Sequence, residues 1–280
     1  MRQHRSVPAG SCKKTRSDRM NRTEVGQPAL LNKVPEVTIY FWIIKVLATT
    51  VGETAADLLS TRLNLGLTIT SYVMSAVFIL ALMFQVRAKR YMPPLYWVTV
   101  VLISVVGTLI SDNLVDGMGI SLTTTSIAFG STLAVVFALW YRSEKTLSIH
   151  TIFTTRRELF YWAAILFTFA MGTSAGDLIA EKLNLGYGPT AIVFAALIGV
   201  IALLYRVVKM DAILSFWLAY IMTRPLGASI GDFLAKPVIA GGLGWGTVTT
   251  SLIFLAAILA LVIFLTISRF DRIEQAPAEA

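Results

Sequence analysis

One pattern recurs four times along this chain: a tryptophan, nine intervening residues, a glycine, four further residues and an aspartate. The copies are separated by 55, 65 and 55 residues, so the first two recur as a unit 120 residues later. A register this strict across three residue types predicts a chain built by internal repetition, with four repeats grouped as two halves. The copies are Trp42–Gly52–Asp57, Trp97–Gly107–Asp112, Trp162–Gly172–Asp177 and Trp217–Gly227–Asp232.

The sequence around these repeats is too apolar for a soluble protein. Hydrophobic residues make up 56% of the 280 residues and charged residues only 14%. Eight apolar stretches are long enough to cross a bilayer, and each repeat contains two of them. We therefore predict an all-α polytopic membrane protein of four two-helix repeats. The predicted spans are 36–57, 67–86, 94–113, 121–141, 159–178, 188–208, 212–233 and 247–268.

The basic residues gather on one side of these spans. The segment 1–33, the loops 87–93, 142–158 and 206–211 and the C-terminal tail hold 19 of the 24 Lys and Arg, whereas the alternate loops hold three. Cytoplasmic loops are enriched in Lys and Arg, so this distribution places both termini in the cytoplasm. All four repeats then enter the membrane in the same direction. They are predicted to be parallel repeats and not inverted ones.

The chain divides into two tails and two membrane halves. We predict a disordered basic cytoplasmic tail over 1–33, membrane halves over 34–150 and 151–270, and a cytoplasmic tail over 271–280. The net charge of +8 does not indicate a nucleic-acid partner, because so much of it lies beside a span, where anionic lipid is the simpler partner. The single cysteine, Cys12, excludes an intrachain disulfide.

The aspartates are the residues that an apolar span is least expected to contain. Each follows its Trp by 15 residues, which is about 22 Å along a helix. The Trp residues are then expected in the cytoplasmic aromatic belt, and the aspartates at one depth near the outer boundary, around a common axis. Two interpretations stay open: the aspartates line a polar cavity or cation site, or each caps a short helix such as 58–62 or 178–182.

The first repeat differs from the others by a second carboxylate. Glu53 and Asp57 are four residues apart and share a helix face, and two close carboxylates can share a proton. We therefore expect proton exchange or primary cation binding in this repeat. The positions that match Glu53 hold Thr108, Thr173 and Ala228.

Four further residues are candidate gating groups or charge partners: Lys45, Asn113, Arg224 and Pro225. Lys45 either extends its ammonium to the cytoplasmic interface or enters the polar core. Arg224 is either a hinge or substrate contact, or a structural partner of an aspartate in a neighbouring repeat. Pro225 should kink its span and free a carbonyl group. Trp140 and Trp245, outside the repeated pattern, are expected to anchor span ends at the lipid interface.

Several short motifs resemble a known family. They are Val34-Pro35-Glu36-Val37-Thr38, Gly52-Glu53-Thr54 and Leu63-Asn64-Leu65-Gly66, with an echo in Glu181-Lys182-Leu183-Asn184-Leu185-Gly186. Together they resemble a family of bacterial membrane-anchored proteins built from a tandem repeat of unknown function, over about residues 33–270. The resemblance implies a multi-span inner-membrane protein and no particular activity.

The charges inside the spans favour a cation as the ligand. Five carboxylates against Lys45 and Arg224 leave a formal excess of −3, which suits a hard cation such as Mn²⁺ or Mg²⁺. The carboxylates predicted to bind the cation, and tentatively to ligate a metal, are Glu53, Asp57, Asp112, Asp177 and Asp232.

These features predict a secondary transporter of a small cation, coupled to protons and embedded in the bacterial inner membrane. The alternatives are a cation channel with an aspartate ring, or a membrane scaffold or regulator that transports nothing. The chain has no P-loop, which excludes an ATP-driven pump within it. It also has no His-Glu-x-x-His or Gly-x-Ser-x-Gly motif, so we expect neither an enzyme nor a cofactor. The sequence leaves the oligomeric state open.

Overall fold

The structure is a computed structural model that describes residues 32–271. These residues all belong to a single compact unit. Nearly all of the predicted N-terminal tail, residues 1–31, and the C-terminal residues 272–280 lie outside the described part. The division of the membrane region at residue 150 stays a prediction from the spacing of the repeats.

Eight long helices carry the fold, and all of them are long and apolar enough to cross a membrane. Their ends agree with the predicted spans to within five residues, which confirms the span assignment. The helices are α2 (Ile39–Asp57), α3 (Leu67–Arg87), α4 (Pro93–Asp112), α5 (Leu122–Glu144), α6 (Thr155–Asp177), α7 (Tyr187–Leu203), α8 (Ala212–Ala235) and α9 (Thr247–Ser268).

Short helical turns follow several of these helices. Four are π-helical, and three of those begin directly after a repeat aspartate, including the 58–62 and 178–182 segments expected from the sequence. The π-helical turns are η1 (Leu58–Arg62), η2 (Asn113–Gly117), η4 (Leu178–Lys182) and η5 (Leu204–Val208), and the 3₁₀ turns are η3 (Ile149–Thr151) and η6 (Val238–Ala240).

The four helices that carry the Trp–Gly–Asp pattern form an inner ring. In cyclic order α2 packs on α4, α4 on α6, α6 on α8, and α8 returns to α2. Between 56% and 61% of the residues in the span windows of these helices are buried, against 6% to 28% in α3, α5, α7 and α9. The second helix of every repeat is therefore the one that remains exposed for contact with lipid.

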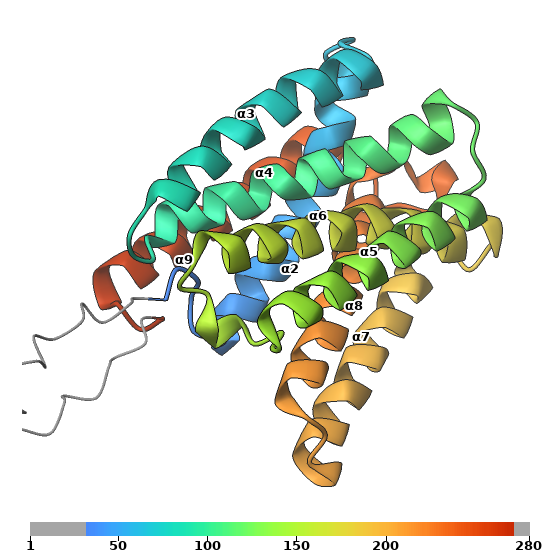
Figure 1. The fold of residues 1–280 in the computed structure, drawn as a ribbon. Coiled ribbons are helices and arrows are strands. Elements are labelled where there is room, and N and C mark those ends of the chain that lie inside the picture. The colour runs from blue at the N-terminus through green and yellow to red at the C-terminus, as the bar shows by residue number, and fades with distance from the viewer. Residues whose placement is uncertain (1–31, 272–280) are drawn as a thin grey trace, which may run out of the picture. The chain divides into compact units, whose positions relative to one another are not determined.

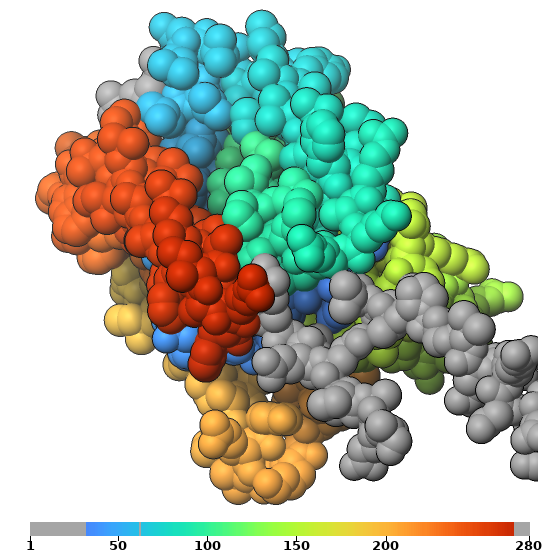
Figure 2. Space-filling view, turned by 90° about the vertical axis from the view of Figure 1, so that its left-hand side faces the viewer, coloured from blue at the N-terminus to red at the C-terminus, as the bar shows by residue number. Residues whose placement is uncertain are grey.

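Each outer helix packs on the inner helix of the next repeat. α3 lies against α4, α5 against α6, α7 against α8, and α9 closes the cycle by packing on α2 (Figure 1). Turned by 90°, the molecule shows α9 and α3 at its surface, with most of α2 covered (Figure 2). The last repeat thus packs against the first, and the four repeats form a closed cycle.

A circle of eight aromatic side chains, which we call the aromatic ring, joins the inner helices at their N-terminal ends. We call this end of the bundle the Trp end. The residue before each Trp is also aromatic, and its ring contacts the Trp of the following repeat at centroid distances of 5.6 to 6.3 Å. The shared N-terminal contact means that the four inner helices run in parallel. The cyclic pairs are Phe41–Trp97, Tyr96–Trp162, Tyr161–Trp217 and Phe216–Trp42.

The predicted lipid-belt role of the repeat tryptophans is wrong for three of them. Trp97, Trp162 and Trp217 are buried, because the aromatic ring encloses them within the bundle. Trp140, expected at the lipid interface, is also buried and packs edge-on against Trp217. Trp245 is half exposed, and its anchoring role stays a prediction.

The glycine of each repeat is the point of closest approach between neighbouring inner helices. A Cβ atom at Gly52, Gly107, Gly172 or Gly227 would lie only 2.5 to 2.6 Å from the Cβ of a side chain on the next inner helix. That side chain always stands three residues before the next glycine in the cycle: Ser104, Phe169, Arg224 and Thr49 respectively. Glycine is therefore required at these positions by packing between helices.

The Leu-Asn-Leu-Gly motif shapes the turn between the two helices of repeats 1 and 3. Asn64 and Asn184 both have φ of 54°, in the left-handed region, where Asn is tolerated better than most residues. Gly66 and Gly186 follow with φ of 73° and 81° and directly precede the outer helices. The shared motif thus encodes the same chain reversal twice.

The predicted N-terminal tail, residues 1–33, is too long by two residues, because Lys33 packs against the bundle. Its side chain is buried, and its Nζ lies 2.8 Å from Glu158 Oε2 and donates to the Val86 carbonyl at 2.9 Å. Its backbone N–H donates to the Ile152 carbonyl. Residues 32 and 33 therefore belong to the packed Trp end, because Glu158 at the start of α6 needs a buried counter-charge.

The glycine ring gives a direct test of the fold. Gly107→Ala should destabilise the protein by about 1–3 kcal/mol, because the new methyl group would lie 2.5 Å from the Phe169 Cβ and 3.2 Å from the Ala170 backbone nitrogen, so the two helices would have to shift. Gly199→Ala on α7 is the matched control, since a Cβ there meets nothing within 4 Å. Thermal unfolding in detergent measures both. Equal melting temperatures for the two variants would contradict the closed packing.

Candidate functional site: a buried Arg–Glu pair beneath an aspartate layer

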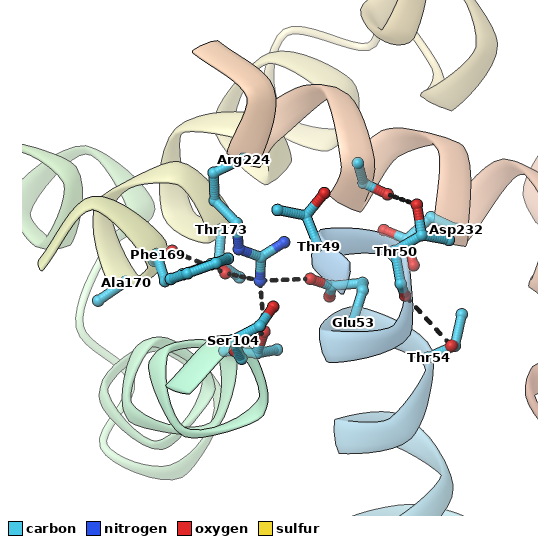
Figure 3. Close-up of polar contacts among 12 residues, drawn as sticks. Thr49, Thr50, Glu53, Thr54, Ser104, Phe169, Ala170, Thr173, Arg224 and Asp232 are labelled. Carbon is cyan, nitrogen blue, oxygen red and sulfur yellow. Dashed lines mark hydrogen bonds and ion pairs between the residues drawn. The ribbon is translucent and has the colours of Figure 1, made fainter. Parts of the chain in front are cut away.

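One nitrogen atom at the centre of the bundle touches all three other inner helices. Nη2 of Arg224 on α8 lies 3.0 Å from Glu53 Oε2 on α2 and donates to the hydroxyls of Thr108 on α4 and Thr173 on α6 (Figure 3). Arg224 is completely buried and Glu53 nearly so. The acceptors are three of the four residues that directly follow the repeat glycines, so the pseudo-symmetry of the sequence becomes a single hydrogen-bonded centre.

The repeat register arranges the inner helices in levels one turn apart. On α2, Lys45, Thr49, Glu53 and Asp57 occur at every fourth residue and share a face. On α8 the matching residues are Tyr220, Arg224, Ala228 and Asp232. The levels therefore run from Lys45 through the Arg224–Glu53 pair to the aspartates at the C-terminal ends of the inner helices, which we call the Asp end.

Of the two interpretations of Arg224, the structure supports a partner in a neighbouring repeat, but the partner is Glu53 and not an aspartate. A buried ion pair gives little net stability, whereas removal of one partner is strongly destabilising because a buried charge remains. Nε and Nη1 of Arg224 have no hydrogen-bond acceptor among residues 32–271. The guanidinium is thus held from one side only.

Pro225 lies inside α8, which continues past it to Ala235. A Cβ at Gly172 would lie 3.1 Å from Pro225 Cδ, and one at Gly176 would lie 3.5 Å from Pro225 Cα. The proline ring thus packs into the glycine-lined surface of α6. Its proposed part in a kink or hinge stays a prediction.

The four aspartates occupy one level, but their surroundings differ. Asp57, Asp112 and Asp177 each end an α-helix, and none caps the π-helical turn that follows. Their carboxylates have no ion pair and accept no hydrogen bond among the described residues, and each is only partly exposed. Capping therefore does not explain them. Electrostatically, Glu53 is a common neighbour of all four aspartates.

Asp232 has a counter-ion of its own. It is buried, and its Oδ2 lies 3.5 Å from Nζ of Lys236, one turn further along the chain. Burial of Lys236 disfavours its ammonium form, but Asp232, Tyr187 and Glu181 outweigh burial and raise the pKa of Lys236 above its ordinary value. Lys236 therefore remains charged and partly neutralises the Asp end beside α8.

The five carboxylates do not form a ready-made metal site. Within residues 32–271 no three His, Cys, Asp or Glu side chains lie close enough together to hold a metal ion. Glu53 is occupied by Arg224, and each aspartate is carried by a different helix. The tentative assignment of all five as one metal ligand set is therefore corrected: the structure shows a spaced layer of carboxylates above a paired Glu53.

Asn113 acts as a structural link and not as a charge partner. Its Nδ2 donates to Ser71 Oγ at 2.6 Å and to the carbonyls of Leu67 and Leu109. These bonds tie the end of α4 to the start of α3, because the amide reaches carbonyls on both helices. Its position beside Asp112 holds that aspartate's helix end in place.

Lys45 enters the core. Its side chain is fully buried, and Nζ lies 4.0 Å from the centroid of the Phe169 ring and 4.2 Å from that of Tyr220. Aromatic faces attract a desolvated ammonium. Of the two interpretations from the sequence, the structure therefore supports the polar core and not the interface.

Sequence reasoning missed two positions that build this centre. One is the aromatic residue before each Trp, and the other is the residue three before each glycine, which packs against the glycine of the preceding repeat in the cycle. Aligning the four repeats on the glycine would have revealed the first as Phe41, Tyr96, Tyr161 and Phe216. The second position holds a different residue in every repeat (Thr49, Ser104, Phe169 and Arg224), so only the packing identifies it.

The fold and this centre define a multi-pass, all-helical membrane protein built from four parallel repeats around a charged axis. The chain belongs to the family described as Repeat of Unknown Function (DUF347), whose model matches it four times, over residues 40–91, 95–146, 160–210 and 215–271. No curated protein and no solved structure matches the chain.

The Arg224–Glu53 pair can be tested by unfolding. Glu53→Gln leaves the guanidinium buried without a counter-charge and should cost about 3–5 kcal/mol of stability. The double variant Glu53→Gln/Arg224→Met should recover part of that loss, because it removes both charges.

Glu181→Gln is the control for this prediction. Its 3.3 Å pair with Lys236 is half exposed, so its loss should cost no more than about 1 kcal/mol. Thermal unfolding in detergent compares the wild type with Glu53→Gln, the double variant and Glu181→Gln. A double variant that is no more stable than Glu53→Gln would contradict a coupled pair.

Proposed function

We propose that this protein is a secondary transporter that carries a small cation through the inner ring, with the aspartate layer as its binding site and protons as the coupling ion. In this proposal it lies in the bacterial inner membrane with both termini in the cytoplasm, as the Lys and Arg distribution favours. The Trp end then faces the cytoplasm and the Asp end faces outward.

The observation that carries the proposal is the set of partnerless carboxylates at the Asp end. Asp57, Asp112 and Asp177 have neither an ion pair nor a hydrogen-bond donor among the described residues, at one level of three parallel helices. A carboxylate within an apolar span is costly unless a ligand, proton or counter-ion compensates it. Three carboxylates at equivalent positions carry this cost, which supports a cation as their missing partner.

The spacing of the layer favours a cation that keeps part of its hydration shell. No three carboxylates are close enough for a dehydrated metal ion, whereas Mg²⁺ and similar hard divalent ions are often bound through one or two carboxylates and several waters. We favour Mn²⁺ as the cargo, with Mg²⁺, Na⁺ and an organic ammonium ion as the alternatives to be tested.

The interior of the ring supports alternating access over a passive channel. Side chains from all four inner helices meet at Arg224 Nη2, and the aromatic ring joins the same helices at the Trp end. A cation moving inward from the aspartates would have to compete with Arg224 for Glu53. Passage therefore needs a rearrangement of the pair, which is a property of a transporter.

Binding measurements test this proposal first. Calorimetric titration of the purified protein with Mn²⁺ should give saturable binding, and Asp112→Asn should weaken it at least about tenfold, or about 1.4 kcal/mol. Titrations with Mg²⁺, Na⁺ and tetramethylammonium rank the alternatives.

Asp116→Asn is the matched control, because Asp116 is exposed and stands one turn beyond Asp112 on the same chain segment. It should leave the Mn²⁺ affinity unchanged. An absence of binding for all four ions, or equal losses in both variants, would count against the proposal and favour a scaffold role. Ohmic currents in planar bilayers would instead favour the channel.

A further inference from the structure

Lys45 is the one cation of the charged axis that nothing in the described residues balances. Two lysines are buried in residues 32–271: Lys33 is ion-paired with Glu158, whereas Lys45 Nζ has neither a counter-ion nor a hydrogen-bond acceptor among those residues. Its surroundings are the faces of Phe169 on α6 and Tyr220 on α8. A buried ammonium without a counter-ion is costly, because burial disfavours an uncompensated charge.

The groups around Lys45 leave it without a negative neighbour of its own. The titratable side chains closest to its level are Tyr220 and Arg224 on α8, Tyr161 on α6, Tyr96 on α4 and Glu53 on α2 itself, while α9 contributes none. Arg224 repels the ammonium, and Glu53 is already paired with Arg224. The aromatic faces accept the charged amine and the apolar core accepts the neutral one, so both forms fit the same place.

From this arrangement we propose that Lys45 carries the coupling proton, being protonated when the aspartate layer is empty and neutral when the layer holds a cation. The inference rests on the proposed function and names the proton site of that transporter. It moves proton exchange from Glu53 and Asp57, where the sequence favoured it, to the amine one turn beyond Arg224 in the direction of the Trp end.

The coupling follows from charge along the axis. Lys45, Arg224, Glu53 and the aspartates occupy successive levels, each one helical turn from the next, and the medium between them is of low dielectric. A cation at the aspartates raises the positive potential at Glu53 and Arg224, and this disfavours a second charge on Lys45. The ammonium then loses its proton to bulk water and becomes an amine. Cation binding and proton release are thus linked.

Proton release on cation binding tests the inference. In weakly buffered detergent solution with a pH indicator, Mn²⁺ added to the wild type should release protons, and Lys45→Met should release about one fewer per Mn²⁺ bound. Methionine preserves most of the side-chain volume, and Lys45→Gln serves as a second variant if Lys45→Met unfolds early. Lys89→Met, on an exposed loop residue, is the control and should release the wild-type number.

Reconstituted vesicles provide the second measurement. Lys45→Met should retain exchange of external ⁵⁴Mn²⁺ for internal Mn²⁺, which needs no net proton movement, and should lose Mn²⁺ accumulation driven by a pH gradient. If Lys45→Met releases as many protons as the wild type and still accumulates Mn²⁺ in response to a pH gradient, the Lys45 inference is overturned and the proposed function stays intact. If the wild type neither binds nor exchanges Mn²⁺, the proposed function fails and the inference fails with it.

Discussion

The close approach of four parallel helices at four glycines is the constraint on which the rest of this structure depends. Without a side chain at Gly52 or its equivalents, each inner helix can accept the residue that stands three positions before the next glycine. Only this packing brings Arg224 near Glu53, Thr108 and Thr173 at one time. Because the contact is cyclic, Gly227 on α8 packs against Thr49 on α2, and the ring of inner helices closes. Van der Waals packing of this kind is what drives helix association in a bilayer.

Repetition then creates the problem that the charged residues solve. Four identical repeats would place four identical side chains on the axis at every level, and four carboxylates at the Asp end repel one another. Departures from symmetry break this pattern: Glu53 and Arg224 are each unique among their equivalents, and they pair. Lys45 is unique at its level as well. The charged axis is thus built from positions where the repeats differ, together with the aspartates where they agree.

The sequence predicted the helices well because hydropathy and the repeat register are local signals. It predicted the parallel repeats from the distribution of Lys and Arg, and the common level of the aspartates from the repeat register. It could not predict that Arg224 pairs with Glu53, since 171 residues separate them and only the cyclic packing brings them together. It misplaced Trp140 and three of the four repeat tryptophans, because an aromatic residue near a span end is compatible with either lipid or a neighbouring helix.

The central claim is that the partnerless aspartates hold a cation inside the inner ring. An anomalous-difference map from crystals of the protein grown with Mn²⁺, collected above the manganese edge, tests this most directly. We expect a peak at the Asp end, between the carboxylates of Asp57, Asp112 and Asp177 and beyond the Arg224–Glu53 pair. If only water lies between these aspartates and manganese binds only at surface carboxylates such as Asp116 or Glu181, the claim is contradicted.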